Sequence, residues 1–189
     1  MSSEENLTRK ETVLEQRKAE VLIKLRGYKL IKKQEDKDTI SYLIRIPKEK
    51  VKALIWCILG ETTVGINIMN NMQKAMKEAG VERGIVVTNG KYTHSANQMA
   101  RKKKIQLIPR DFPAFDLFKH ELVPKHEVLT KQEEDELLNR YKIHPYQLPQ
   151  ISSKDPAVIA IGAEPSNIVR ITRRSLTAGK HVTFRYVVE

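Results

Sequence analysis

The 189-residue sequence lacks the features of secreted and membrane proteins. It has a single cysteine, Cys57, so an internal disulfide is impossible and the usual zinc-binding cysteine patterns are missing. No apolar run approaches the roughly 20 residues that a membrane-spanning helix needs. The first residues, MSSEENLTRKET, are polar and contain no apolar stretch of the kind found in signal peptides. We therefore expect a protein of a reducing intracellular compartment with no membrane partner.

Acidic residues are scarce relative to basic ones, and the formal net charge is +11. Residues 1–118 hold 23 basic and 14 acidic side chains, an excess of nine, whereas residues 119–189 hold 11 and 9, an excess of two. A basic surface can lie beside a polyanion, of which the phosphate backbone of nucleic acid is the commonest. The alternative is a solvated basic surface without a specific partner. The charge distribution therefore favours a front part of the chain that lies close to nucleic acid.

The front part alternates between helical and strand-like patterns. Strands are expected at residues 28–33, 39–46, 51–59, 83–88 and 105–108, and the uniformly apolar 51–59 segment is typical of a central strand. A first helix places Val13, Leu14, Val21, Leu22 and Leu25 on one face and ends at Gly27. A second carries the stripe Val64, Ile68, Met72, Ala75, Met76 and Ala79 and ends at Gly80, and Thr93 caps a third. Helices between the last strands predict parallel strand pairing.

This order of elements resembles the restriction-endonuclease-like fold. The segment from Ala53 to Ile108, ALIWCILG through IQLI, is similar to the Mrr-type branch of that fold. The resemblance implies an α/β domain. In the enzymes of this fold, an acidic residue on one strand and an acidic residue or glutamine on the next hold a divalent metal, and a lysine two residues further along that second strand acts on the attacked phosphate.

The residues at those positions argue against nuclease chemistry. Trp56-Cys57-Ile58 stands where the acid, spacer and lysine are needed, and neither Trp56 nor Ile58 can ligate Mg²⁺ or donate to phosphate. The preceding strand offers Ser41, Leu43 and Arg45 instead of an aspartate. Asp36 and Asp38 precede that strand in a charged turn, and Glu61 follows the next strand without a matching lysine. We therefore expect an inactive module with no catalytic residue.

A run of four cations, Arg101, Lys102, Lys103 and Lys104, follows the third expected helix. Such a run can complement the negative end of a helix dipole, or it can contact phosphates. The sequence leaves both interpretations open, and we predict these four residues as the DNA-proximal ones. No aromatic ladder accompanies them, so a groove that stacks single-stranded bases is not expected.

The back part predicts a small α+β domain. Thr130 and Glu133 form a capping box before a helix that is expected to bury Leu137, Leu138 and Tyr141. Asp155-Pro156 begins a short helix that Gly162 ends. A strand begins at Ile168, a loop spans Ser175 to Gly179, and a partner strand alternates through Val182, Phe184, Tyr186 and Val188. Because this last strand lies at the C-terminus, we expect it to be a free edge to which another chain can pair.

The motifs HELVPKHEVLT, RYKIHPYQLPQI, DPAVIAIGA and RRSLTAGKHVTFRYVV run nearly without gaps from about His120 to Val188. They resemble the small subunit shared by archaeal and eukaryotic RNA polymerases, which in eukaryotes is the fifth common subunit. The resemblance implies an assembly domain that docks on the largest polymerase subunit. The interface residues that it suggests are His120, Arg140, Arg173, Arg174, Arg185 and Tyr186.

Other chemistry in the back part has little support. His120 and His126 are six residues apart without a third ligand nearby, which is a poor metal pattern. Ser175 has no histidine and aspartate arranged around it in its segment, so a nucleophilic role is not expected either. We predict no metal and no cofactor.

The sequence as a whole predicts a basic restriction-endonuclease-like jaw module at 1–110, a linker at 111–118 and a polymerase assembly domain at 119–189. The predicted function is a non-catalytic subunit of DNA-directed RNA polymerase. Its predicted partners are the largest subunit, the rest of the polymerase and downstream duplex DNA. The alternatives are a stand-alone Mrr-type nuclease and a DNA-binding factor that docks on polymerase. The host lineage stays open, with the cytoplasm expected for an archaeal chain and the nucleus for a eukaryotic one.

Overall fold

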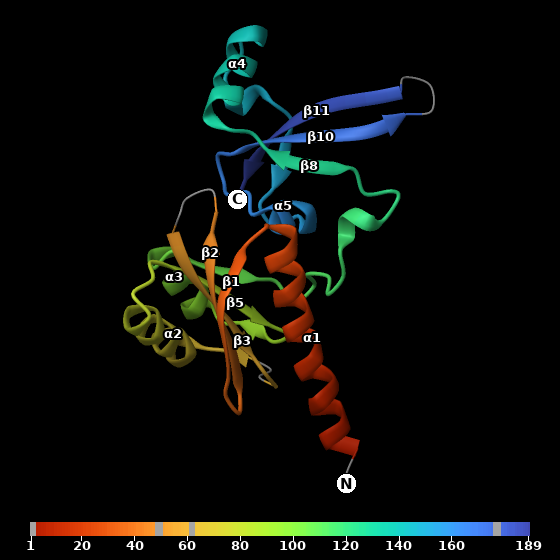
Figure 1. The fold of residues 1–189 in the computed structure, drawn as a ribbon. Helices are drawn as coiled ribbons and strands as arrows, with labels where there is room; N and C mark the ends of the chain where they lie inside the picture. Colours follow the sequence, from red (N-terminus) through yellow and green to blue (C-terminus); the bar gives the residue numbers. More distant parts are fainter. Residues whose placement is uncertain (1–2, 48–50, 61–62, 176–178) are drawn as a thin grey trace. The chain divides into compact units, whose positions relative to one another are not determined.

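The chain divides into two compact units, Met1–Phe115 and Asp116–Glu189 (Figure 1). The computed structural model describes residues 3–47, 51–60, 63–175 and 179–189, with only the backbone described for 3–13, 174 and 175. Each unit has its own sheet and its own hydrophobic core. Both combine helices with strands, which confirms the expected mixed α/β class at this coarse level.

The front unit is built on a five-stranded sheet with the order β1-β2-β3-β5-β7. Its strands are β1 (Lys29–Glu35), β2 (Thr39–Ile46), β3 (Val51–Ile58), β5 (Arg83–Thr88) and β7 (Ile105–Ile108). The pairs β1–β2 and β2–β3 are antiparallel, whereas β3–β5 and β5–β7 are parallel, as the crossover helices predict. The central position of β3 agrees with its apolar sequence, because both of its faces are covered.

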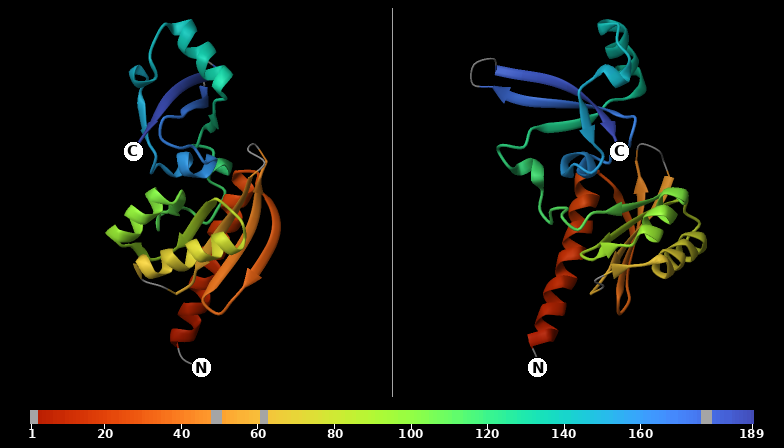
Figure 2. Two further views of the ribbon diagram at one scale, coloured as in Figure 1. Left: turned by 90° about the vertical axis from the view of Figure 1, so that its left-hand side faces the viewer. Right: turned by 180° about the vertical axis from the view of Figure 1, so that it is seen from behind.

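Helices cover both faces of this sheet (Figure 2). Helix α1 (Ser3–Leu25) packs on the face that carries Ile55 and Cys57, and the Cys57 thiol lies 3.9 Å from the Glu15 carbonyl oxygen. Helices α2 (Ile66–Glu78) and α3 (His94–Lys102) cover the opposite face. There, Met69, Met72 and Met76 of α2 and Ala96 and Ala100 of α3 share a core with Leu54, Ile58 and Val86 of the sheet.

Local signals set most of the element boundaries in the front unit. Gly27 has φ of 64° and follows α1, as expected of a helix stop. The Thr93 hydroxyl accepts a hydrogen bond from the Ala96 N–H at 3.2 Å, which confirms Thr93 as the cap of α3. The placement of Val64 on a helix was wrong, because extended Gly65 precedes α2. Val64 instead lies in β4 (Thr63–Val64), paired with β6 (Lys91–Tyr92).

The back unit is a four-stranded sheet between two helices. Its strands are β8 (Lys125–Val128), β9 (Gln150–Ser152), β10 (Ile168–Ser175) and β11 (Gly179–Val188), in the order β8-β10-β11-β9. Leu137 of α4 (Lys131–Tyr141) packs with Ile168, Phe184 and Tyr186 on one face. Val158 of α5 (Pro156–Ile161) packs with Val169, Ile171 and Val187 on the other. Two short 3₁₀ turns, Leu117–Lys119 and Pro145–Gln147, complete the unit.

One expectation for the back unit was wrong, and a second is confirmed only in part. Tyr141 is not buried: it is the last residue of α4, 56% exposed, and its ring lies 5.8 Å from the Arg140 guanidinium. Strand β11 is a free edge only before Tyr186, because β9 pairs with Tyr186–Val188 from the other side. The sequence did not predict this pairing because a parallel strand of three residues carries no periodicity.

Candidate interaction surfaces

The positions of the nuclease metal site are occupied by packing residues. Trp56 and Ile58 point to the face of β3 that α2 and α3 cover, where both pack into the core. Leu43 of β2 belongs to the same core, and Ser41 lies opposite Trp56. Cys57 points to the α1 face, where burial raises the pKa of its thiol. Because β2 and β3 contain no aspartate or glutamate, the sheet offers no carboxylate to a metal at these positions.

The acidic residues nearest to these strands lie outside the sheet. Asp36 and Asp38 are exposed in the turn between β1 and β2, where the Asp36 carboxylate accepts a hydrogen bond from the Lys37 N–H at 2.8 Å. Their interpretation as turn residues is confirmed. Glu61 lies outside the described residues. Among the residues that the structure describes, no three His, Cys, Asp or Glu side chains form a group that could hold a metal ion.

The basic run lies where α3 gives way to β7. Arg101 and Lys102 form the last turn of the helix, Lys103 is its C-cap, and Lys104 has φ of 54° in the left-handed region. All four side chains are exposed. The Lys104 carbonyl oxygen accepts a hydrogen bond from the Gly84 N–H at 3.4 Å, so the turn is tied to the start of β5. The placement suits both a helix-dipole role and a phosphate contact.

Strands β10 and β11 bring two of the predicted interface residues into a protruding hairpin. Arg173 is exposed and lies opposite His181, and Arg174 lies opposite Lys180. The side chain of Arg174 lies outside the described residues. Beyond Thr172, β10 has lost its pairing with β8, and β9 reaches only the far end of β11. This part of the hairpin therefore has unpaired edges on both sides.

The other predicted interface residues do not gather on one face. Arg185 and Tyr186 are consecutive in β11 and so point to opposite faces of the sheet. Arg185 Nη1 donates to the Gln150 carbonyl oxygen at 3.0 Å, and the Tyr186 ring packs beneath α4. Arg140 is exposed near the end of α4, and His120 accepts the Leu122 N–H at 3.2 Å in an exposed turn. Whether any of these residues contacts a partner stays a prediction.

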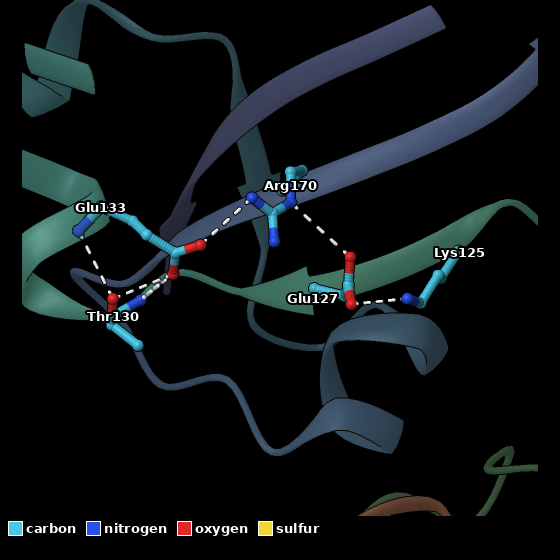
Figure 3. Close-up of polar contacts among 5 residues, drawn as sticks. All are labelled: Lys125, Glu127, Thr130, Glu133 and Arg170. Carbon is cyan, nitrogen blue, oxygen red and sulfur yellow. Dashed lines mark hydrogen bonds and ion pairs between the residues drawn. The ribbon is translucent and has the colours of Figure 1, made fainter. Parts of the chain in front are cut away.

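An ionic network that the sequence does not reveal connects β8, β10 and α4 (Figure 3). Arg170 of β10 lies between two carboxylates: its Nη1 is 3.2 Å from Glu133 Oε1, and its Nε is 3.6 Å from Glu127 Oε2. Lys125 Nζ is 2.6 Å from the other oxygen of Glu127. The second oxygen of Glu133 accepts hydrogen bonds from the Thr130 N–H at 2.8 Å and the Thr130 hydroxyl at 2.9 Å. The capping box is therefore confirmed, and it is also linked to the sheet.

Both carboxylates of this network are held in the charged form. The pKa of Glu127 is lowered, chiefly by its hydrogen bond with Lys125 and then by the charges of Lys125 and Arg170. The pKa of Glu133 is lowered by the hydrogen bonds from the Thr130 N–H and hydroxyl, and then by Arg170. Because Arg170 contacts both Glu133 of α4 and Glu127 of β8, the network connects the first turn of α4 to the sheet.

Comparisons with known proteins assign each unit to a class. Residues 12–112 match the restriction endonuclease family of Mrr type, and this range makes up most of the front unit. Residues 115–187 match the C-terminal domain of RNA polymerase Rpb5, which covers nearly all of the back unit. The class that emerges is a polymerase-subunit domain preceded by a nuclease-like module.

Individual relatives agree with this assignment. The DNA-directed RNA polymerase subunit Rpo5 of Thermococcus onnurineus is 52% identical over 75 residues, which are 40% of this chain and 92% of the relative. Rpo5 of Staphylothermus marinus is 56% identical over 73 residues, 39% of this chain and 80% of the relative. The RPABC1 subunit of RNA polymerases I, II and III of Caenorhabditis elegans is 36% identical over 132 residues, 68% of this chain and 63% of the relative.

This chain belongs to the Rpb5/Rpo5 family of DNA-directed RNA polymerase subunits, and its front unit belongs to the Mrr-type restriction endonuclease family. It is thus a transcription protein, as the motifs of the back part predict. In the part of the chain that the structure describes, no helix is long and apolar enough to span a membrane.

Proposed function

We propose that the chain is a non-catalytic subunit of DNA-directed RNA polymerase whose back unit docks on the largest subunit. The observation that carries this proposal is the extent of the archaeal match. Seventy-five residues of this chain cover 92% of Thermococcus onnurineus Rpo5, a protein named as a polymerase subunit. Because that relative consists almost wholly of this unit, the match supports a back unit that is sufficient for assembly.

The shape of the back unit supports docking. Small domains bury a limited share of their surface, so a partner adds stability. The outer half of the β10–β11 hairpin offers unpaired strand edges that a larger chain can extend. Exposed Arg173 lies on this hairpin, and arginine is enriched at interface hot spots. We assign the docking contact to this hairpin, with Arg140 and His120 as further candidates.

The front unit, in this proposal, lies near downstream duplex DNA and has no nuclease activity. Its excess of nine positive charges supports proximity to a polyanion. The apolar Trp56 and Ile58 in the core of the sheet support the loss of metal chemistry, since apolar side chains cannot ligate a metal whatever their geometry. We expect the complex to act in the cytoplasm if the source is archaeal and in the nucleus if it is eukaryotic.

A truncation tests whether the back unit alone is responsible for docking on the largest subunit. A chain reduced to residues 116–189 should co-purify with the largest polymerase subunit as well as the full chain does, whereas residues 1–115 alone should not. The R173E variant of the full chain should weaken this capture, and E164Q, a change at an exposed position between α5 and β10, serves as its control. Capture that needs residues 1–115 would overturn the proposal.

A further inference from the structure

Strand β1 is an edge of the front sheet and is exposed along its whole length (Figure 2). The other edge strand of this sheet, β7, has four residues, of which two are buried. In β1, by contrast, all seven side chains from Lys29 to Glu35 are exposed. Among the described strands only β2 pairs with β1, so the backbone N–H and C=O groups on its outer side have no partner strand. Of the two edges, β1 is therefore the one that is open to an approaching chain.

Two large apolar side chains follow one another on this edge. Leu30 is 53% exposed and Ile31 is 47% exposed. Leu30 lies opposite Ile44 and Lys32 lies opposite Leu43, so Ile31 is an extra residue without a partner in β2. A bulge and lysines are devices that keep an edge strand from pairing indiscriminately, but exposed leucine and isoleucine have the opposite effect. Their exposure favours a selective partner that covers them over an edge that is only protected.

The lysines of β1 differ in their contacts. Lys33 forms an ion pair with Glu35, and its Nζ lies 5.7 Å from the centroid of the Tyr42 ring, so its charge is already engaged within the unit. Lys29 and Lys32 are exposed, and the ion pairs within the described ranges include neither of them. These two charges are available to an acidic group from outside the chain.

The register of the sheet adds two further cations beside the edge. Lys29 lies opposite Arg45, and Arg45 lies opposite Lys52, so three exposed cations form a row across β1, β2 and β3. Like charges that lie directly opposite one another destabilise a strand pair. An acidic side chain placed next to Lys29 would therefore stabilise this part of the sheet as well as bind to it.

Charge, exposed apolar side chains and an unpaired backbone together select the class of partner. A nucleic-acid phosphate backbone would satisfy the lysines, but it would leave Leu30 and Ile31 uncovered and could not pair with alternating N–H and C=O groups. A second copy of β1 would bring one basic strand against another, which like-charge repulsion opposes. An extended peptide that carries both acidic and apolar side chains matches all three features.

We propose that β1 binds an extended acidic segment of another protein, which joins the front sheet as an additional strand. The segment pairs with the regular part of the edge, residues 32–35, beyond the bulge. Its acidic side chains lie beside Lys29 and Lys32, and its apolar side chains cover Leu30 and Ile31. Main-chain hydrogen bonds supply affinity and the side chains supply selectivity. This binding goes beyond the proposed function, because neither assembly into polymerase nor proximity to DNA requires it.

Synthetic peptides test the strand addition on the unmodified full chain. The probe is a fluorescent peptide of about eight residues, within the usual length of a strand, in which valine and glutamate alternate. One control peptide has lysine at every glutamate position, and a second has proline at the two central positions. Because the N–H groups of adjacent strand residues point to opposite sides, one of the two prolines removes a hydrogen bond to β1. By fluorescence anisotropy the probe should bind, and each control should bind at least about tenfold more weakly.

Variants of the full chain locate the site. K29E/K32E reverses the two available charges, and L30T/I31T replaces the apolar pair by a residue that keeps a preference for strands. K74E/K91E, at exposed positions of α2 and β6, makes the same change of charge elsewhere in the unit. Both edge variants should weaken binding at least about tenfold, and K74E/K91E less than about twofold. In the wild type, bound probe should slow amide hydrogen exchange in residues 29–35, and thermal melting checks that each variant is folded.

Each of the other outcomes overturns the inference. Equal weakening by K29E/K32E and K74E/K91E would show that only net charge matters. Equal binding of the proline peptide would show an ionic contact without strand pairing. Unchanged binding by L30T/I31T, with displacement of the probe by a short DNA duplex, would assign the surface to phosphate instead. No binding of the probe, or slowed exchange only outside β1, would remove the site. None of these results bears on the subunit function proposed above, which the truncation tests separately.

Discussion

Arg170 on β10 and Glu133 at the start of α4 form an ion pair with a separation of 3.2 Å, and this pair connects a helix cap to the central part of a sheet. Glu133 uses its other oxygen to accept the Thr130 N–H, so one side chain closes the capping box and holds the helix on the strand. The backbone contributes a further link, because the Ile168 N–H donates to Glu134 Oε1 at 3.2 Å. Helix α4 is therefore held on the sheet by polar contacts at its first turn and by the apolar packing of Leu137.

The first prediction concerns Thr130. The T130A variant removes the acceptor for the Glu133 N–H and should lower the free energy of unfolding of the back unit by about 1 kcal/mol. T130S keeps the hydroxyl and should restore most of the loss. Q132A, an exposed change in the same turn, is the matched control. Chemical denaturation followed by circular dichroism measures all three, and equal effects of T130A and Q132A would contradict the role of the cap.

The second prediction concerns pH. Folding lowers the pKa values of Glu127 and Glu133 below their unfolded values, so their stabilisation is complete above the unfolded pKa of about 4.3 and is lost as pH falls through the folded pKa. The melting temperature of the back unit should fall as the pH is lowered below about 5. E127Q/E133Q should show a shallower fall, and E121Q, an exposed glutamate outside the network, should follow the wild type. Parallel curves for wild type and double variant would refute the network.

A third prediction concerns Gly84, which faces α2. An added Cβ would lie 2.8 Å from both the Met72 methyl and the Met76 sulfur. Replacing glycine in a strand with alanine gains about 0.5–1 kcal/mol of backbone entropy, whereas overpacking a core costs about 1–3 kcal/mol. The contacting atoms are the ends of flexible methionine side chains, which can shift but only within a buried core, so overpacking should exceed the entropy gain slightly and G84A should destabilise the front unit by about 0.5 kcal/mol. The cost should shrink in the M76A background, and a G84A variant as stable as wild type would contradict the packing described.

The fourth prediction concerns nuclease activity. Purified full chain should leave supercoiled plasmid uncut with Mg²⁺ or Mn²⁺, because Trp56 and Ile58 stand at the positions expected for the metal-binding residue and the lysine, and both pack into the core. The assay should include the D38N and E61Q variants to identify the source of any cleavage. Metal-dependent cleavage that either variant abolishes would show that the module has kept an active site built from residues outside β2 and β3.

Much of the fold follows from local sequence signals. The caps at Thr93, Thr130 and Asp155 and the glycine stops at Gly27 and Gly162 act within one or two turns of chain, so they can be recognised without the rest of the molecule. The short strands β4, β6, β8 and β9 were missed because two to four residues carry little periodicity, whereas the equally short β7 was recognised from its apolar residues before Pro109. They form strands because a partner lies beside them.

The interaction surfaces were harder to predict for the same reason. Arg101 to Lys104 are consecutive and therefore visible in the sequence, whereas Lys29, Arg45 and Lys52 are isolated and become neighbours only through strand register. Arg185 and Tyr186 are neighbours in sequence, but the pleat of β11 sends them to opposite faces. The sequence therefore grouped Arg185 with Tyr186, which the fold separates. It did not reveal that Lys29, Arg45 and Lys52 are neighbours.

The central claim, that the chain works as a polymerase subunit, is tested most directly by its stoichiometry. Polymerase would be purified from the source cell through a tag on a catalytic subunit, washed at high salt, and the amounts of all chains determined by quantitative mass spectrometry. The account predicts that this chain stays in a fixed, equal ratio to the two largest subunits. A substoichiometric amount that the wash removes would identify a dissociable DNA-binding factor instead, and would contradict the claim.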